Sequence, residues 1–261
     1  MKLQVLVAAM HQTDHSLLDR MNIQTDAIVV NQCNRNEIEE FEHRGRSIKW
    51  LSFNERGVGL SRNTALMRAV GDIVLFADED ITYVDDYEKI IIETFEKKPN
   101  ADIIIFNVPS TNPDRPCYVI PKESKVSLFN CMRYGMVKVA ARTESMRKKN
   151  LNFSLLFGGG ARYGSGEDSM FLIDCLRRGL FMCAIPLQIG SAAQEDSTWF
   201  SGYNEKHLFD KGAFFRATSK WLAKPLCIQI LFRHKMMWKP MGISFFKAYK
   251  LMCDGAKEMS R

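Results

Sequence analysis

The chain has 261 residues, of which 46% are hydrophobic and 25% are charged, and its net charge at pH 7 is +6. This is the composition of an ordinary globular protein, and a chain of this length can bury a large core without disulfides or metals to hold it together. No run of about 18 apolar residues occurs, which argues against a transmembrane helix. The apolar segment at the amino terminus is too short for a signal peptide and lacks a cleavage site, so we expect none.

Seven cysteines are spread through the chain, and none forms a C-x-x-C pair or a zinc-type cluster with histidine. An odd number of cysteines in apolar segments is typical of reduced, buried thiols. This pattern indicates a reducing compartment. We therefore expect a cytoplasmic protein, with peripheral contact at the inner face of the plasma membrane as a further option.

Apolar runs of strand length alternate with helical periodicity through the first 110 residues. Expected strands cover residues 3–10, 27–30, 48–53, 73–77 and 103–108, and expected helices cover residues 37–44, 61–70 and 87–97. This alternation predicts an α/β fold with a mostly parallel sheet that helices cover on both faces.

The second half of the chain is less regular. A proline-containing loop is expected at residues 112–121, and residues 125–147 mix strand and helix signals. A glycine-rich stretch follows at residues 158–166. A helix over residues 168–178, closed by Gly179, and a strand over residues 181–185 complete the predicted domain.

Polar side chains follow three of the predicted strands where each strand ends. These are the pairs His11-Gln12 and Asn31-Gln32 and the acidic run 78–80 (Asp-Glu-Asp). Because ligands of such sheets bind outside the carboxyl ends of the strands, we expect the three clusters to meet at one edge.

The acidic run is the first candidate site. In an extended chain Asp78 and Asp80 point to the same side, and two carboxylates there can hold a hard divalent cation through oxygen. The alternative is a solvated acidic turn, because acidic residues are common after strands.

The residues before this run carry a longer motif. Residues 54–63 read N-E-R-G-V-G-L-S-R-N, a helix follows, and then a strand ends in D-E-D. This arrangement resembles the family 2 glycosyltransferases, whose pattern places N-x-G-x-S-x-A-R-N before a helix, a strand and D-x-D. The resemblance implies a GT-A, Rossmann-like fold and a nucleotide-sugar donor, with a UDP-sugar favoured. It implies that Asp80 binds Mn²⁺ or Mg²⁺, that Asp78 contacts the ribose or the metal, and that Arg62 reaches the nucleotide phosphates. The alternative for Arg62 is a surface cation on the first helical turn.

The second candidate site opens the helix near residue 168. Acidic residues are favoured at any helix amino terminus, which is the plain explanation for Glu167 and Asp168. The run Gly166-Glu167-Asp168 also resembles the G-E-D motif of the same family. That resemblance implies that Asp168 is the general base of an inverting transfer and that Glu167 helps to hold the acceptor. Gly159 and Gly160 would then let the backbone approach the sugar.

A third candidate and two departures from the family pattern complete the expected site. The segment 194–199 stands where family members close over the donor, so Glu195 and Trp199 are assigned to the sugar site, with a plain surface loop as the alternative. Where the family has V-D-D-G-S this chain has V-N-Q-C-N, and Gln32 and Asn34 are assigned to the base. Where it has P-x-Y-N this chain has A-M-H-Q, and Ala9 is assigned to the nucleotide.

The end of the chain differs in charge from the rest. Residues 203–261 contain 12 lysine or arginine and 4 aspartate or glutamate residues, while the remaining residues sum to −2. We predict a catalytic domain over residues 1–202 and a basic, helical extension over residues 203–261. The extension either packs on the core with a solvated basic face or lies on an anionic membrane surface.

The sequence thus predicts an inverting, metal-dependent glycosyltransferase that acts on a glycan or a lipid-linked acceptor in surface polysaccharide synthesis. Two other classes are weighed against it. A nucleotidyltransferase also carries carboxylates and a metal, but it needs a basic glycine-rich loop after the first strand, which residues 8–14 lack. A non-catalytic nucleotide-binding scaffold would fit the missing base-reading aspartate. No nucleic-acid partner is expected, because the basic tail has no reading motif.

Overall fold

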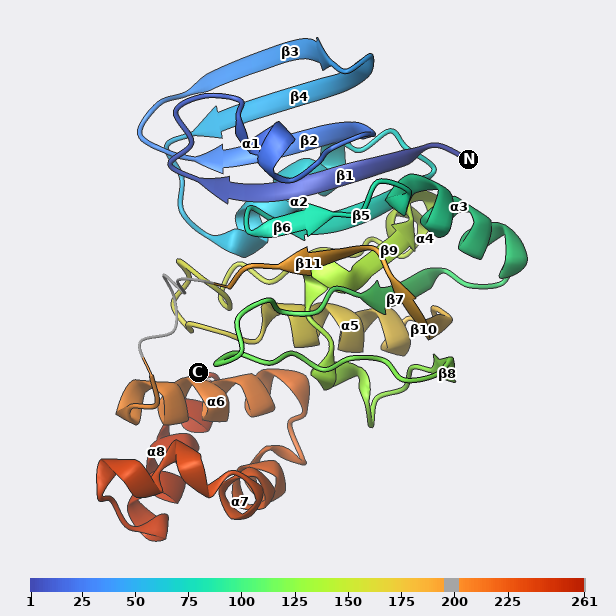
Figure 1. The fold of residues 1–261 in the computed structure, drawn as a ribbon. Helices are drawn as coiled ribbons and strands as arrows, with labels where there is room; N and C mark the ends of the chain where they lie inside the picture. The colour runs from blue at the N-terminus through green and yellow to red at the C-terminus, as the bar shows by residue number, and fades with distance from the viewer. Residues whose placement is uncertain (195–201, 261) are drawn as a thin grey trace.

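The computed structural model describes residues 1–194 and 202–260 (Figure 1). A nine-stranded sheet with the order β3-β4-β2-β1-β5-β9-β7-β10-β8 forms its centre. Its strands are β1 (Leu3–Met10), β2 (Asp26–Gln32), β3 (Glu37–His43), β4 (Arg46–Phe53), β5 (Ile73–Asp78), β7 (Ile103–Asn107), β8 (Ser124–Lys125), β9 (Val139–Arg142) and β10 (Met182–Gln188). The strands β6 (Ile81–Tyr83) and β11 (Gly190–Ala192) pair separately.

Helices cover both faces of the sheet and form the carboxyl-terminal end of the chain. They are α1 (Leu17–Arg20), α2 (Val58–Arg68), α3 (Tyr87–Lys97), α4 (Thr143–Lys148), α5 (Glu167–Arg177), α6 (Glu205–Thr218), α7 (Ala223–Arg233) and α8 (Phe245–Glu258). Short 3₁₀ helices are η1 (Cys131–Arg133), η2 (Met136–Lys138), η3 (Lys235–Met237) and η4 (Lys239–Met241).

The direction of the strands confirms the mostly parallel sheet. Strand β1 is parallel to β2 and β5, β2 is parallel to β4, and β7 is parallel to β10. Strand β9 runs opposite to both β5 and β7, so these two also share a direction. Only β3, β8 and β9 of this sheet run the other way.

Alternation along the strands builds two apolar layers. Leu6, Val74 and Phe76 belong to the layer beneath α2 and α5, whereas Val5 and Leu75 belong to the layer beneath α1 and α3. Successive side chains of a strand point to opposite faces of the sheet. Because both faces are covered, every position of a central strand is buried, and the sequence of the strand is a continuous apolar run. This is why these central strands were predictable from sequence.

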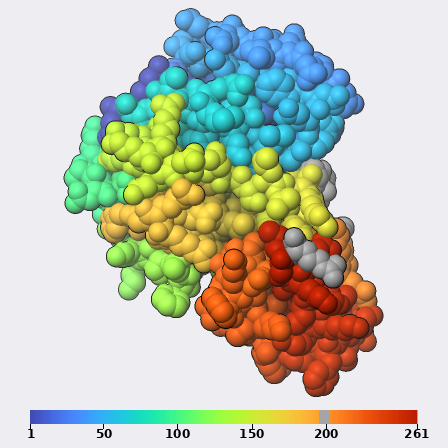
Figure 2. Space-filling view, turned by 180° about the vertical axis from the view of Figure 1, so that it is seen from behind, coloured from blue at the N-terminus to red at the C-terminus, as the bar shows by residue number. Residues whose placement is uncertain are grey.

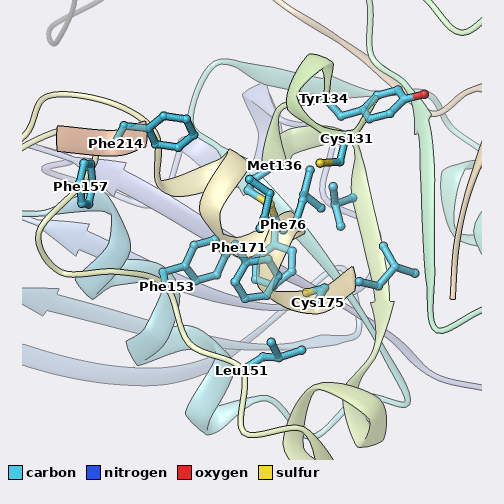
Figure 3. Close-up of a cluster of buried hydrophobic side chains, with 14 of the residues drawn as sticks. Phe76, Cys131, Tyr134, Met136, Leu151, Phe153, Phe157, Phe171, Cys175 and Phe214 are labelled. Carbon is cyan, nitrogen blue, oxygen red and sulfur yellow. The ribbon is translucent and has the colours of Figure 1, made fainter. Parts of the chain in front are cut away.

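Aromatic rings fill the layer between the sheet and α5 (Figure 3). Phe153 and Phe171 stack with ring centroids 4.0 Å apart, and Phe76 meets both rings edge-on. Such pairs contribute about 0.5–1.5 kcal/mol each beyond the burial of their surface. The packing fixes the segment before α5, and therefore the amino terminus of α5, against the sheet.

The prediction of a helix over residues 37–44 is wrong. This segment forms β3, which pairs antiparallel with β4 and brings Glu40 opposite Lys49, with 2.7 Å between their carboxylate and ammonium groups. Phe41 points inward and stacks on His15 at 4.4 Å. Charged side chains on an edge strand discourage pairing with further strands. The high proportion of charged residues in this segment is also typical of a solvent-exposed helix, which is why the sequence indicated a helix.

The irregular second half resolves into short elements. Within residues 125–147, β9 inserts antiparallel between β5 and β7, and 3₁₀ helices precede it. The predicted strand that ended at residue 185 continues as β10 to Gln188. Its register with β7 shifts between Ala184 and Gln188, around Pro186, which has no N–H to donate.

The carboxyl-terminal helices confirm the predicted basic helical extension. They form a lobe at the lower edge of the molecule in Figures 1 and 2. Helices α6 and α8 approach closely at two glycines: a Cβ on Gly212 would lie 1.8 Å from the Met252 carbonyl oxygen, and a Cβ on Gly255 would lie 1.9 Å from that of Phe209. Leu208 of α6 belongs to the same apolar cluster as α5. The domain boundary after residue 202 stays a prediction.

In the described part of the chain, the helices are too short or too polar to cross a membrane.

Candidate active site

The three polar clusters meet at the carboxyl ends of β1, β2 and β5, as predicted. The register places Ala8 beside Asp78. The Gln12 amide donates to Asn31 Oδ1 at 3.0 Å, and the Gln12 side-chain amide donates to Glu79 Oε2 at 2.7 Å. Direct hydrogen bonds therefore join the ends of all three strands into one rigid edge.

A cavity of about 880 Å³ lies at this edge. Asp78 follows Phe76 by two residues in β5, so it points toward α2 and α5, and the cavity lies on that side. Residues from the strand ends that line it include Ala8, Met10, Gln32, Asp78 and Asp80. The opposite wall comes from the glycine loop 158–160, the start of α5 and the start of α6.

Arg62 lies at the centre of the cavity wall. Its side chain is 3% exposed, so the interpretation of it as a surface cation is wrong. One guanidinium nitrogen donates to Asp168 Oδ1 at 2.5 Å, and another donates to Asp78 Oδ1 at 2.9 Å. Glu167 lies 3.6 Å away. Burial alone would lower the pKa of Arg62, but these three carboxylates together raise it above its ordinary value.

Asp168 is held on both of its oxygens. Oδ1 accepts from Arg62, and Oδ2 accepts from the Met136 amide of η2 at 3.0 Å. The first turn of α5 also presents free amide groups and the positive end of the helix dipole. The carboxylate is therefore fixed in direction, which a proton acceptor at a reaction centre requires.

Glu167 is the most perturbed carboxyl group of the cavity. Burial and then the charge of Asp168 raise its pKa to about 7, while Arg62 opposes the shift. Its place depends on glycines: a Cβ on Gly158 would lie 2.7 Å from the Glu167 Cδ. Gly166 has φ 118°, and a Cβ there would lie 2.6 Å from Phe214. No other residue type fits these two positions without movement.

Asp80 is the best candidate ligand for a divalent cation. Burial and the nearby charge of Asp78 raise the pKa of Asp80, and its Oδ2 accepts from the Gln194 amide at 3.3 Å. A carboxylate in this position gains from a bound cation, which offsets both costs. Among residues 1–194 and 202–260 no three His, Cys, Asp or Glu side chains are arranged to hold a metal ion.

The other predicted site residues are distributed as follows. Gln32, Gly159 and Gly160 line the cavity, and Gln32 Oε1 accepts from the Gly57 amide at 2.6 Å. Ala9 packs in the apolar layer on the other face of the sheet, and its neighbours Ala8 and Met10 line the cavity. Asn34 is exposed, and its side chain accepts from Arg56 at 2.8 Å.

Two of the assigned residues lie outside the described part of the chain. These are Glu195 and Trp199, which were assigned to the sugar site. Their predicted role is neither supported nor opposed by the structure.

Several lining residues were not found from sequence. Arg115 reaches the cavity from the loop 112–121, and Lys206 and Asp210 reach it from α6. Lys206 and Asp210 form an ion pair at 2.5 Å, and Asp210 also accepts from the Gly164 amide at 2.9 Å. His207 of the same helix also lines the cavity. Burial, followed by the charge of Lys211, lowers the pKa of His207. No local motif marks these positions, because they lie far along the chain from the other clusters.

The family of the chain follows from comparison with known sequences. The model of glycosyl transferase family 2 matches residues 8–156, which is more than half of the chain. This chain belongs to glycosyl transferase family 2. The matched segment contains Arg62, Asp78 and Asp80, and the activity of this family-2 enzyme is glycosyl transfer. A search of curated proteins finds no match.

Solved structures with the same fold include TarS of S. aureus. The crystal structure of TarS 1–349 has a TM-score of 0.65 at 13% identity, covering 99% of this chain and 83% of that chain. The complex of TarS 1–349 with UDP-GlcNAc has a TM-score of 0.62 at 16% identity, covering 90% and 72%. The complex with UDP has a TM-score of 0.61 at 13% identity. At these identities the likeness establishes the fold, and it confirms the predicted GT-A architecture.

Proposed function

We propose that this family 2 glycosyltransferase moves a sugar from a nucleoside diphosphate sugar to a hydroxyl group of a glycan or lipid-linked acceptor, with inversion and with help from Mn²⁺ or Mg²⁺. Surface polysaccharide synthesis is the proposed setting. This proposal rests mainly on the charge of the side chains that line the cavity. Six carboxylates and three lysine or arginine side chains line it among the described residues. A diphosphate entering alone would meet net repulsion, so a divalent cation has to accompany it.

The donor half of the cavity fits a nucleoside diphosphate. Asp80, with Asp78 beside it, would hold the cation, which would offset the negative charge that grows on the departing diphosphate. Arg62 already lies against Asp78, and its fixed charge favours phosphate on the same side. Gln32 can hydrogen-bond a base edge where other members carry aspartate. The UDP and UDP-GlcNAc complexes of TarS support a uridine nucleotide.

The acceptor half supplies the base. Asp168 takes the proton from the acceptor hydroxyl as that oxygen attacks the anomeric carbon. The bond from this carbon to the diphosphate oxygen breaks on the opposite side, so the anomeric configuration inverts. Arg62 and the Met136 amide hold the carboxylate in place for this step. Glu167, whose pKa is raised to about 7, precedes Asp168 in the chain and would help to hold the acceptor.

The first test is calorimetric titration with UDP, GDP and dTDP, with and without Mn²⁺. The wild type is expected to bind one of these nucleotides only with the metal, and Asp80→Asn is expected to lose that binding. Asp86→Asn, which changes an exposed acid at the start of α3, serves as the matched control and should bind as the wild type does. If no nucleotide binds in the presence of metal, the transferase proposal fails and a non-catalytic scaffold becomes the better interpretation.

Asp168→Asn separates binding from chemistry. It should bind the nucleotide as tightly as the wild type, while sugar transfer falls by about 10²–10⁴-fold, the range for loss of a general base. Asp174→Asn on the same helix is the control and should retain activity. NMR of the product should show the anomeric configuration opposite to that of the donor. Retention would overturn the inverting mechanism.

A further inference from the structure

The surface of the carboxyl-terminal lobe carries an unusual set of exposed apolar side chains. Trp221 is 91% exposed, Phe246 81%, Phe232 61% and Met236 60%. Phe232 of α7 and Phe246 of α8 are linked through the ring of Phe245, with centroid distances of 4.9 Å and 6.0 Å. The rings of Phe232 and Phe246 are therefore close to each other, while Trp221 comes two residues before α7 and Met236 lies in η3, which follows α7. We call the surface formed by these four exposed side chains the lobe face.

Helix α7 has two apolar sides. Ala223, Cys227 and Leu231 are buried against the rest of the lobe. Ile228 and Phe232 are exposed, one turn apart. A helix whose outer side is also apolar can bury that side only against a further apolar surface. Both residues stay exposed although the ring of Phe245 from α8 lies beside Phe232.

Basic side chains greatly outnumber acidic ones in the segment that carries the lobe face. Residues 211–253 contain nine lysine or arginine residues and no aspartate or glutamate. Lys224, Arg233, Lys235 and Lys239 are exposed, and none of them forms an ion pair with a described residue. Lys247 differs, because it pairs with Glu205 of α6 at 2.6 Å. Two of the exposed rings thus have a basic neighbour in the chain, Arg233 after Phe232 and Lys247 after Phe246.

We propose that the lobe face binds the surface of an anionic lipid bilayer. The rings of Trp221, Phe232 and Phe246 would enter the boundary between headgroups and acyl chains, and the flanking lysine and arginine side chains would contact lipid phosphates. Single-stranded nucleic acid can use the positive charge and stack bases on exposed rings, but it has no use for the exposed aliphatic side chains of Ile228 and Met236. A bilayer uses the charge, the rings and the aliphatic groups together.

Binding of the lobe face to a bilayer would also fix the position of the cavity relative to the membrane. Helix α6 supplies cavity residues and is locked to α8 by the close contacts at Gly212 and Gly255. A bilayer bound to α7 and α8 would therefore hold the cavity at a fixed height above the lipid. This consequence rests on the proposed function, because it suits an acceptor anchored in that bilayer. The docking itself does not depend on it.

The test uses the full chain and two kinds of vesicle. Binding is measured by flotation with vesicles of phosphatidylcholine alone and of phosphatidylcholine and phosphatidylglycerol in equal parts. The wild type should bind only the second kind. The double variants Trp221→Ser/Phe232→Ser and Lys224→Glu/Lys235→Glu should each lose about tenfold or more in affinity, since one basic residue near an anionic surface contributes about fivefold.

The controls separate docking from folding and from catalysis. Ile38→Ser removes a side chain that is 59% exposed on β3, at the opposite end of the molecule (Figure 1), and should leave binding unchanged. Brominated lipid should quench tryptophan fluorescence of the wild type, and Trp221→Ser should abolish that quenching. All variants should bind nucleotide as the wild type does, so a failed donor site would not be confused with failed docking.

Three results would overturn the proposal. The wild type could fail to bind the anionic vesicles at low salt. The variant Trp221→Ser/Phe232→Ser could bind the anionic vesicles as tightly as the wild type does, which would show that binding depends on charge alone. The wild type could also bind RNA while leaving the vesicles unbound.

Discussion

A single guanidinium joins the two halves of the site. Arg62 contacts Asp78 of β5 and Asp168 of α5, and Asp168 lies 106 residues further along the chain. The arginine therefore aligns the predicted donor carboxylate with the predicted base. It also keeps three partly buried acidic groups from facing one another without a cation.

Removing this charge should destabilise the fold. Arg62→Met is expected to lower the free energy of unfolding by up to about 3 kcal/mol, because it leaves three carboxylates without their buried partner while solvent still reaches part of each one. Urea denaturation measures the change. Arg68→Met, in the last turn of the same helix, is the matched control and should stay within about 0.5 kcal/mol of the wild type. Equal stability of the two variants would contradict the role given to Arg62.

Glu167 should make stability depend on pH. Its pKa is about 7 in the folded chain and ordinary in the unfolded chain, so between about pH 4.5 and pH 7 the folded state binds more protons. The contribution of Glu167 to the free energy of unfolding must then fall as pH rises through this window. Replacement by glutamine removes the effect, so Glu167→Gln should gain on the wild type by at most about 1.4 kcal/mol per pH unit.

Denaturation of both proteins at several pH values without metal tests this sign. A constant difference between Glu167→Gln and the wild type would show that Glu167 does not change its protonation on folding. A difference that moves in favour of the wild type as pH rises would show that its pKa is lowered. Either outcome would remove the argument that this group is poised near neutral pH.

At the level of elements, the contact between α6 and α8 controls one wall of the cavity. Their backbones approach so closely at Gly212 and Gly255 that no side chain fits between them. Because α6 also supplies Lys206 and Asp210 to the cavity, the contact ties the shape of the cavity to the carboxyl-terminal lobe.

Gly212→Ala should therefore destabilise the chain although alanine is the better helix former. Alanine gains about 1 kcal/mol over glycine inside a free helix, but the added methyl group would lie 1.8 Å from the Met252 carbonyl oxygen. Overpacking of this kind costs about 1–3 kcal/mol or more. Thermal unfolding measures the loss, with the exposed Lys250→Ala on α8 as the control. Stabilisation by Gly212→Ala would show that the two helices can move apart freely.

Across the whole molecule, one apolar cluster extends from the sheet through α5 into the carboxyl-terminal lobe. Phe76, Phe171, Phe214 and Met252 all belong to it. A chain with a shared cluster should unfold as one unit, because neither part can separate without exposing apolar surface. The two parts on either side of residue 202 would then differ in charge and in role, but they would fold and unfold together.

Calorimetry tests this cooperativity. We expect one transition for the full chain, and we expect residues 1–202 alone to aggregate, since they would expose the rings that α6 and α8 cover. Two separate transitions, or a stable folded fragment, would show instead that residues 203–261 form an independent domain.

Local patterns in the sequence determined the central strands, the helices α3 and α5, and the meeting of three polar clusters at one edge. Each of these depends on the alternation or periodicity of neighbouring residues, and the parallel sheet then brings its strand ends together. The motif residues Asp78, Asp80, Glu167 and Asp168 could be named because they resemble the D-x-D and G-E-D motifs of family 2 glycosyltransferases. They stand at fixed places on elements that the pattern already predicts.

Only the tertiary structure decided what surrounds those residues. Residues 37–44 became a strand because β4 offered a partner and His15 offered a surface for Phe41. Arg62 became a buried cation because Asp168 arrives from another helix, and the pKa of Glu167 rises because that same fold removes water from it. Arg115 and the residues of α6 reached the cavity without any motif. Burial, protonation and ion pairing depend on distant segments, and their contacts exist only once the chain has folded.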